Sequence, residues 1–299
     1  MVVNPGRTDR LWRGVVITAP YLWLLIFFLV PFAIVLKISL ADPLVAQPPF
    51  SNFFDWTGST GRRVLATLDN YRFLFEDRLY LVSYLNSIRI ALIATGLCLL
   101  LGFPMALAIA RTPYPWRNLL LLLVILPFWT SFLLRVYAWM VMLGKQGLIN
   151  QLLLSLGLVD TPLQLLYTDW AVYLGIVYTY VPFMILPLYA SLEKLDPDLH
   201  EAAADLGARR HRVFLDVTLP LALPGIIAGC LLVFIPALGE YVIPALLGGL
   251  DTLMIGRTLY DEFFVNRDWP LASAVAVVLL MILLLPMMLF QRLSQESEA

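Results

Sequence analysis

Charge is scarce in this 299-residue sequence. Charged residues make up 14% of the chain and hydrophobic residues 61%, whereas ordinary soluble domains have roughly 25% and 45–50%. The formal net charge is −1 and the sequence contains no lysine-rich tract, so nothing indicates a nucleic-acid partner. The composition instead predicts an all-α integral membrane protein that contacts the lipid bilayer.

Cysteine and histidine are also rare. The two cysteines, Cys98 and Cys230, both lie in apolar runs, as small core residues do. Together with only two histidines, they give no disulfide framework and no metal-ligand spacing. The sequence also lacks a G-x-S-x-G motif and the phosphate-binding G-x-x-x-x-G-K-[ST] loop. We therefore expect no catalytic residues, no metal and no cofactor, and the missing phosphate loop excludes an ATPase.

Six runs are long and apolar enough to cross a bilayer, which takes about 20 helical residues. They lie near 15–40, 82–110, 118–143, 170–192, 221–247 and 270–291. The first run is too long for the core of a signal peptide, so we read it as an uncleaved span. The arginine-rich segment around 209–212 and the arginines of the N-terminal tail predict that both termini are cytoplasmic.

These spans divide the chain into four parts. We expect a cytoplasmic tail over 1–14, the first span with a long periplasmic loop over 15–81, a core over 82–291, and a cytoplasmic tail over 292–299. A leucine stripe between 147 and 160 is too short to span and predicts a helix along the outer surface.

The fifth run is the least regular. Pro224, Pro236, Gly239 and Pro244 interrupt it, and Glu240 lies inside it. Irregular backbone at membrane depth is tolerated where protein or a water-filled cavity surrounds it. This pattern predicts a broken helix beside a translocation path.

A polar island from Leu199 to Ile226 follows the fourth run, and we expect the loop between the fourth and fifth spans over 193–220. Asp196-Pro197 is a typical helix start, the alanines after Glu201 favour a helix, and Gly207 permits a sharp turn. A second short helix is expected over 209–217, before Leu219-Pro220 and the next span. Two short helices joined by a turn could seat in the groove of another protein; the alternative is a solvated loop that only joins two spans.

The order Glu201-Ala202-Ala203, Gly207, Leu219-Pro220 resembles the cytoplasmic EAA loop of ATP-binding-cassette importer permeases. Further segments, at 19–32, 120–140, 178–189, 234–249 and 255–276, are similar to the putrescine permease subunits of bacterial polyamine importers. The resemblance implies a type I importer permease fold with six transmembrane helices in the bacterial inner membrane. It also implies that the coupling to the ATPase runs through Glu201, Ala202, Ala203, Gly207, Ala208, Leu219 and Pro220.

The same resemblance implies the partners. They are a second, non-identical permease, two ATPase subunits that bind ATP-Mg, and a periplasmic polyamine-binding protein. A permease for spermidine or another small solute, such as a ferric chelate, is the main alternative to a putrescine permease. A secondary transporter or a channel is a weaker alternative, because neither would need an EAA loop.

A polyamine is a flexible dication, and carboxylates and aromatic faces both attract ammonium groups. Glu240 is the strongest candidate for the substrate path, since a carboxylate in a span is costly unless it is paired or wet. The aromatic candidates, each of which could instead serve packing or interfacial anchoring, are Tyr241, Trp129, Tyr137, Trp139, Tyr178 and Tyr180. The alternative for Glu240 is a structural ion pair.

Two arginines are the candidate partners of Glu240 in such a pair, Arg135 and Arg89. For Arg135 we favour a gate or a helix-packing ion pair, because a free arginine would repel a cation in the path. Three acidic residues in the last outer loop, Asp261, Glu262 and Asp268, predict a periplasmic entrance that attracts cations or a docking surface for the binding protein. A solvated loop is the alternative for them.

Overall fold

The computed structural model describes residues 7–51, 54–55, 63–64 and 66–297. The ends of both predicted tails, 1–6 and 298–299, lie outside the described residues. The chain forms two compact units, one of Met1–Asp77 with Asp261–Leu280 and one of Arg78–Tyr260 with Met281–Ala299.

The first unit begins with one long apolar helix. It consists of α1 (Arg7–Leu24), a π-helical turn (Leu25–Leu29) and α2 (Val30–Ser39), and its Val16–Ser39 part is long enough to cross a membrane. The Asn70 amide donates to the carbonyls of Ser39 and Ala41, at 3.0 and 2.8 Å. This buried amide therefore ties the loop that follows the first span back to the end of α2.

The rest of the first unit consists of short elements and the first part of a long helix, α15. Strands β1 (Phe54–Asp55) and β2 (Arg63–Val64) pair antiparallel, and α3 (Asp69–Glu76) follows. A π-helical turn (Asp261–Val265) leads into the long α15 (Trp269–Ser297), whose residues up to Leu280 belong to this unit. The rings of Phe263 and Trp269 stack at 5.0 Å across that turn.

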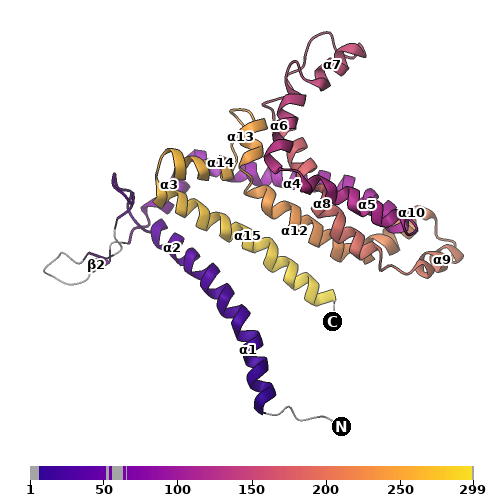
Figure 1. The fold of residues 1–299 in the computed structure, drawn as a ribbon, viewed down its shortest axis with the longest axis horizontal. Helices are drawn as coiled ribbons and strands as arrows, with labels where there is room; N and C mark the ends of the chain where they lie inside the picture. Colours follow the sequence, from indigo (N-terminus) through magenta and orange to yellow (C-terminus); the bar gives the residue numbers. More distant parts are fainter. Residues whose placement is uncertain (1–6, 52–53, 56–62, 65, 298–299) are drawn as a thin grey trace. The chain divides into compact units, whose positions relative to one another are not determined.

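Three helices form the core of the second unit: α4 (Arg78–Arg111), α8 (Asp169–Leu192) and α12 (Leu223–Leu238). They lie side by side (Figure 1). Gly102 of α4 and Gly229 of α12 both face Met184 of α8, and a Cβ at either position would lie within 2.9 Å of that side chain. Small residues let transmembrane helices approach closely, so these glycines set the spacing of the three helices.

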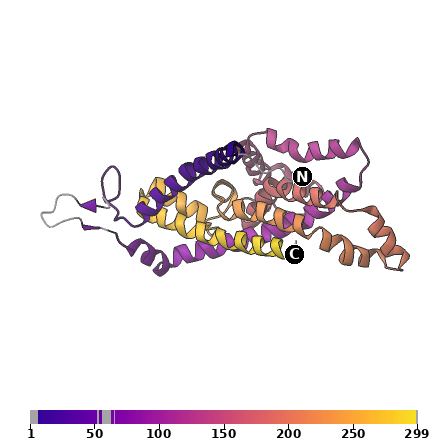
Figure 2. The ribbon, with the colours of Figure 1, turned by 90° about the horizontal axis from the view of Figure 1, so that it is seen from below.

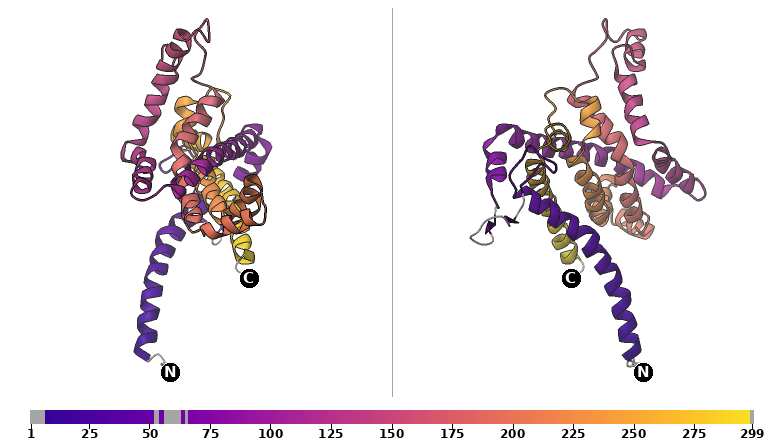
Figure 3. Two further views of the ribbon diagram at one scale, coloured as in Figure 1. Left: turned by 90° about the vertical axis from the view of Figure 1, so that its right-hand side faces the viewer. Right: turned by 60° about the vertical axis from the view of Figure 1, so that its left-hand side comes forward.

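Shorter helices surround this core. Helix α5 (Trp116–Ile125) continues in a 3-10 turn (Leu126–Trp129), and α6 (Phe132–Leu143) with α7 (Leu148–Ser155) extends away from the packed helices of this unit (Figure 3). Helix α7 lies within the 147–160 stripe and has the expected short length. Helix α13 (Val242–Leu247) completes the broken fifth run, and α14 (Ile255–Tyr260) follows it.

Opposite ends of α8 carry different structures. At its N-terminal end, the amide of Tyr167 donates to the carbonyl of Leu247 at the end of α13, at 3.0 Å. Beyond its C-terminal end lies the hairpin of α9 (Pro197–Asp205) and α10 (Arg210–Val213) (Figure 2). A π-helical turn (Phe214–Thr218) and α11 (Leu219–Leu221) lead from the hairpin into α12.

The helical class predicted from the sequence is confirmed. In the described part of the chain, five helical segments are long and apolar enough to cross a membrane: Val16–Ser39, Arg78–Arg111, Phe132–Ser155, Asp169–Leu192 and Trp269–Met288. A sixth span arises if Arg210–Leu221 and Leu223–Leu238, bent by 65°, count as one. The expected single helix over 118–143 is wrong: the chain is extended at Thr130 (ψ 151°), which separates α5 and its 3-10 turn from α6. Proline at the start of that turn favours a break there.

The break expected in the fifth run is present. Helix α12 ends at Leu238, α13 begins at Val242, and Glu240 lies in the gap. Pro236 remains inside α12 and Pro244 inside α13, so the break falls at Gly239 and not at a proline.

Candidate coupling loop and substrate path

The α9–α10 hairpin follows from local sequence chemistry. The Asp196 carboxylate accepts a hydrogen bond from the Asp198 amide at 3.0 Å and so caps α9. Gly207 has a φ of +80°, and the amides of Gly207 and Ala208 return to the carbonyls of Ala204 and Ala203. A glycine with positive φ is a common helix end. The start and the turn predicted for the polar island are both confirmed.

The hairpin presents its predicted coupling residues unevenly. Glu201, Ala202, Gly207 and Pro220 are exposed, whereas Ala203, Ala208 and Leu219 are half-buried. Next to the turn, the side chain of Leu206 is 90% exposed. Sequence reasoning missed Leu206. Its signal was a large apolar residue directly before the turning glycine.

The hairpin is attached to the core by polar and aromatic contacts. The His200 ring and the buried Thr218 hydroxyl lie 3.0 Å apart and connect its two arms. Phe214 packs edge-on against Phe103 of α4, with ring centres 5.5 Å apart. A cavity of about 560 Å³ remains between the ends of α4 and α8 and the hairpin, and Glu201 is among its lining residues.

Glu240 caps the helix that follows the break. Its Oε1 accepts hydrogen bonds from the amides of Tyr241, Val242 and Ile243, at 3.2, 3.0 and 3.4 Å. Its Oε2 accepts a hydrogen bond from the hydroxyl of Tyr180, near the middle of α8. The residue is only 8% exposed. A carboxylate at a helix N-terminus satisfies amides that have no partner within the helix.

A second helix holds the same break in place. Gly256 of α14 lies so close that a Cβ there would be 2.4 and 2.6 Å from the carbonyl oxygens of Gly239 and Glu240. The Ile255 amide next to it donates to the hydroxyl of Ser87 in α4, at 2.7 Å. The gap between α12 and α13 is therefore fixed by α8 on one side and by α14, anchored on α4, on another.

The arginines proposed as ion-pair partners of Glu240 lie elsewhere. Arg89 is 4.0 Å from the carboxylate of Asp169. The guanidinium of Arg135 lies over the rings of Phe128 and Phe132, at 5.4 and 6.0 Å. Within the described residues, the partners of Glu240 are amides and a tyrosine hydroxyl, because the break leaves the first amides of α13 open beside its own side chain.

The aromatic path candidates fall into separate groups. Tyr241 stacks on Tyr260 at 4.0 Å, and Trp139 meets Tyr178 edge-on at 5.4 Å. Trp129 is 73% exposed and Tyr137 is also exposed, so these two join neither pair. Tyr180 is the candidate that the structure brings to Glu240.

Tyr180 also borders an apolar groove of about 700 Å³ between α8 and α12. Phe183 lines it beside Tyr180, with Leu231, Leu232 and Ile235 from α12. Sequence reasoning missed Phe183, although it lies three residues after Tyr180 and so one helical turn away on the same face.

The acidic residues of the predicted entrance take part in local structure. The Asp268 carboxylate accepts the Leu271 amide at 3.0 Å at the start of α15. Glu262 is buried and accepts the Asn266 amide group at 2.9 Å, and Asp261 is half-buried. Burial, with the negative charge of Glu262 as a smaller cause, raises the pKa of Asp268. Glu262 and Asp268 thus have structural roles within the first unit.

The membrane-crossing helices, the broken fifth run and the exposed hairpin indicate a subunit of a membrane transport system. Residues 78–297 match the family of binding-protein-dependent transport system inner membrane components. The chain belongs to this family. It is therefore a multi-pass inner-membrane permease, and the prediction of a non-catalytic subunit is confirmed.

Curated relatives are similar over most of the chain. The spermidine/putrescine transport system permease protein PotB of Escherichia coli is 45% identical over 233 residues, which cover 78% of this chain and 84% of the relative. PotB of Haemophilus influenzae is 40% identical over 94% of this chain and 93% of the relative. The inner membrane ABC transporter permease YdcU of E. coli is 35% identical over 82% and 80%.

Solved structures have the same fold. A bacterial ABC transporter that imports alginate gives a TM-score of 0.64 at 22% identity, covering 95% of this chain and 99% of the solved one. The alginate transporter in complex with a pentasaccharide-bound periplasmic protein gives 0.67 at 20%, with coverages of 96% and 98%. The predicted importer permease fold is confirmed.

Proposed function

We propose that this chain is the permease subunit of an ATP-driven importer for polyamines, with putrescine as the favoured substrate and spermidine as the alternative. The observation that carries the proposal is the combination of an exposed Glu201-Ala202-Ala203 hairpin with 45% identity to a spermidine/putrescine permease. Without the hairpin, a transporter that needs no separate ATPase would be an equal candidate. Without the 45% sequence identity to PotB, nothing would favour a polyamine as the solute.

The proposed assembly has five components. This chain pairs with a second, non-identical permease, two ATPase subunits bind the cytoplasmic hairpins, and a periplasmic polyamine-binding protein docks outside. The exposed Leu206 beside Gly207 supports docking, because buried apolar anchors dominate the affinity of protein interfaces. Both termini of the chain are then cytoplasmic, on the side of the hairpin.

The proposed mechanism is alternating access. ATP binding closes the two ATPases, the hairpin carries that motion into the spans, and the outer mouth opens to receive the polyamine. Hydrolysis resets the assembly to face inward. The rigid packing of α4, α8 and α12 around Met184 supports this mechanism, because packed helices move as bodies and do not deform continuously.

For the substrate path we propose the surroundings of Glu240 and Tyr180. The carboxylate attracts an ammonium group, and the neighbouring apolar groove of about 700 Å³ fits the hydrocarbon part of a polyamine. The stacked ring of Tyr241 and the Trp139–Tyr178 pair offer further faces for a cation. Trp129 and Tyr137 are weaker candidates because both are exposed and neither contacts Glu240.

The test is reconstitution of the complete complex in vesicles, with ATP hydrolysis measured against each solute. Putrescine with the binding protein should stimulate hydrolysis and drive uptake, and this chain alone should do neither. Stimulation by spermidine but not putrescine would reassign the solute within the class. Uptake by vesicles that hold this chain alone, driven by an ion gradient, would overturn the proposal and indicate a secondary transporter.

A further inference from the structure

An ion pair joins the base of the hairpin to the turn between α4 and α5. Glu193 directly follows α8, and its amide still donates to the carbonyl of Tyr189 at 2.8 Å, so its backbone continues the helix. It is also the first residue of the 193–220 loop. Movement of the hairpin relative to α8 therefore bends the chain next to this position.

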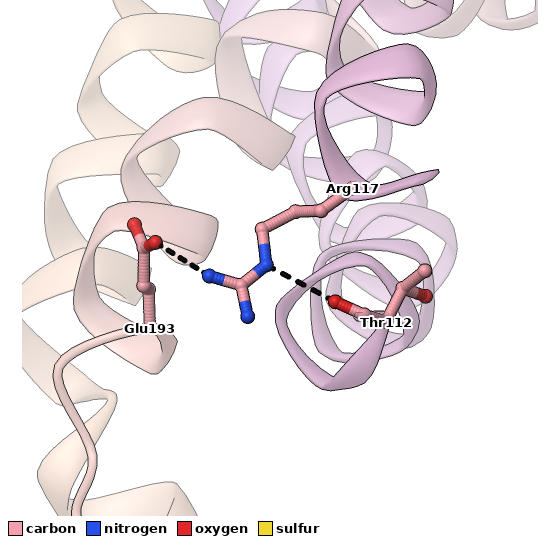
Figure 4. A network of polar contacts seen from close by, with 3 residues as sticks. All are labelled: Thr112, Arg117 and Glu193. Carbon is pink, nitrogen blue, oxygen red and sulfur yellow. Dashed lines mark hydrogen bonds and ion pairs between the residues drawn. The ribbon is translucent and has the colours of Figure 1, made fainter. Parts of the chain in front are cut away.

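Arg117 supplies the other half of the pair. It lies in the first turn of α5, where its Nη1 donates to the Glu193 carboxylate at 2.8 Å. Its Nε donates to the carbonyl of Thr112 at 3.1 Å, directly after α4 (Figure 4). One guanidinium thus closes the turn between α4 and α5 and connects it to the end of α8, 76 positions further along the chain.

The ion pair is a direct contact between the turn after α4 and the base of the hairpin, beside a cavity. Arg117 and Glu193 line the cavity of about 560 Å³ that separates the end of α4 from the hairpin, with Arg111, His200 and Glu201 on its other sides. Side chains transmit displacement by contact, and a void has no atoms to do so. Charge-assisted hydrogen bonds are shorter and stronger than neutral ones, so this contact can pass a displacement from one element to the other.

We infer that Arg117 and Glu193 are positioning residues for energy coupling: their ion pair transmits movement of the hairpin to the turn between α4 and α5. The inference rests on the proposed function, in which the hairpin docks an ATPase. Neither residue touches the solute in this account. They set how far α4 and α5 move when the hairpin moves.

The pair is partly solvated, with side-chain exposures of 29% for Arg117 and 43% for Glu193. Partly exposed pairs are weak, and breaking one changes an equilibrium by about two- to fivefold. Loss of the pair should therefore leave the chain folded and inserted. It should lower the number of solute molecules transported per ATP hydrolysed, because the ATPases continue to cycle while the spans follow less completely.

The experiment uses the reconstituted complex with whichever solute stimulates the wild-type ATPase. Arg117→Glu and Glu193→Arg should each lower the uptake per ATP hydrolysed about fivefold, while pull-down of the ATPase and basal hydrolysis stay at wild-type levels. The double reversal should recover at least half of the coupling ratio, because it restores the pair but not the bond to Thr112. Arg72→Glu, which breaks the exposed Arg72–Glu76 pair of the other unit, is the matched control and should change none of these values.

Three results would overturn the inference: single reversals with a wild-type coupling ratio, a double reversal no better than either single variant, or loss of ATPase binding in the pull-down. The last would place the two residues in the docking surface itself. Failure of the proposed function is separate, since a wild-type complex would then show no solute-stimulated hydrolysis with polyamines. The coupling ratio can still be measured in that case with the solute that does stimulate it.

Discussion

Replacement of Glu240 by glutamine separates the two roles that this side chain can have. The glutamine side chain keeps a carbonyl oxygen that can accept the amides of α13. The Tyr180 hydroxyl can turn from donor to acceptor for the new amide group. The cap and the link to α8 should therefore survive, and the negative charge alone is removed. Glu240→Ala instead removes both acceptors from a site that is only 8% exposed.

The structure sets the size of each effect. An ammonium group about 5 Å from a carboxylate gains about 3 kcal/mol at an effective dielectric constant of about 20. Three amides already donate to the carboxylate of Glu240 and weaken its attraction for a cation. We therefore expect the attraction to be about 1.4 kcal/mol, so its loss in Glu240→Gln should slow uptake about tenfold. For Glu240→Ala, loss of a cap and burial of unsatisfied donors together cost about 3 kcal/mol of folding free energy.

The assay combines thermal unfolding of the purified subunit with putrescine uptake by the reconstituted complex. Glu240→Gln should unfold within a few degrees of wild type, assemble normally, keep its basal ATPase activity and take up putrescine about tenfold more slowly. Glu240→Ala should unfold at a clearly lower temperature. Wild-type uptake by Glu240→Gln would refute the role in the path and leave Glu240 as a helix cap alone. Failure of Glu240→Gln to assemble would instead show that its charge is structural.

Three further experiments test other parts of the molecule. Glu201→Lys reverses an exposed charge, and proline at position 207 cannot adopt the φ of +80° found there. Each variant should therefore abolish uptake although the protein is inserted in the membrane. Normal uptake by either one would exclude docking through this hairpin. Gly225→Ala should cost about 1–3 kcal/mol, measured by thermal unfolding, since its Cβ would lie 2.7 Å from a backbone oxygen, whereas Gly96→Ala has open space and should cost nothing. Asp268→Asn should flatten the pH dependence of the free energy of unfolding. The pKa of Asp268 is raised in the folded protein, so the native state keeps this proton to a higher pH than the unfolded state does. The stability of the wild type therefore falls as the pH rises from 3.8 to the raised pKa, and the variant lacks this change.

Much of the fold could be predicted because the bilayer imposes simple rules. Length and hydropathy located the spans, and local chemistry located the cap at Asp196 and the turn at Gly207. The interruption at Thr130 was missed because hydropathy stays high through that region. A change of backbone direction there depends on a proline and one extended residue, which leave the composition unaltered.

The site was less accessible to sequence reasoning. The Arg117–Glu193 pair joins residues 76 positions apart, and pairing at that separation depends on how α5 packs beside α8. The periplasmic entrance at Asp261, Glu262 and Asp268 stays a prediction that rests on their charge, and charge alone could not show which amides hydrogen-bond Glu262 and Asp268. The sequence shows which groups carry charge, but only the fold shows which groups already have partners.

Glu240 illustrates why that difference matters for a transporter. Judged from the sequence, a carboxylate inside a span needs either an arginine or water. The broken helix supplies a third solution, because an interrupted span exposes amides at its new N-terminus, and these stabilise an anion at low cost. In Glu240 three backbone amides hold one carboxylate oxygen and the Tyr180 hydroxyl holds the other, so no arginine is needed to keep the side chain in place. The break therefore allows a carboxylate to lie beside α8, and the loss of uptake expected for Glu240→Gln tests whether a polyamine uses it.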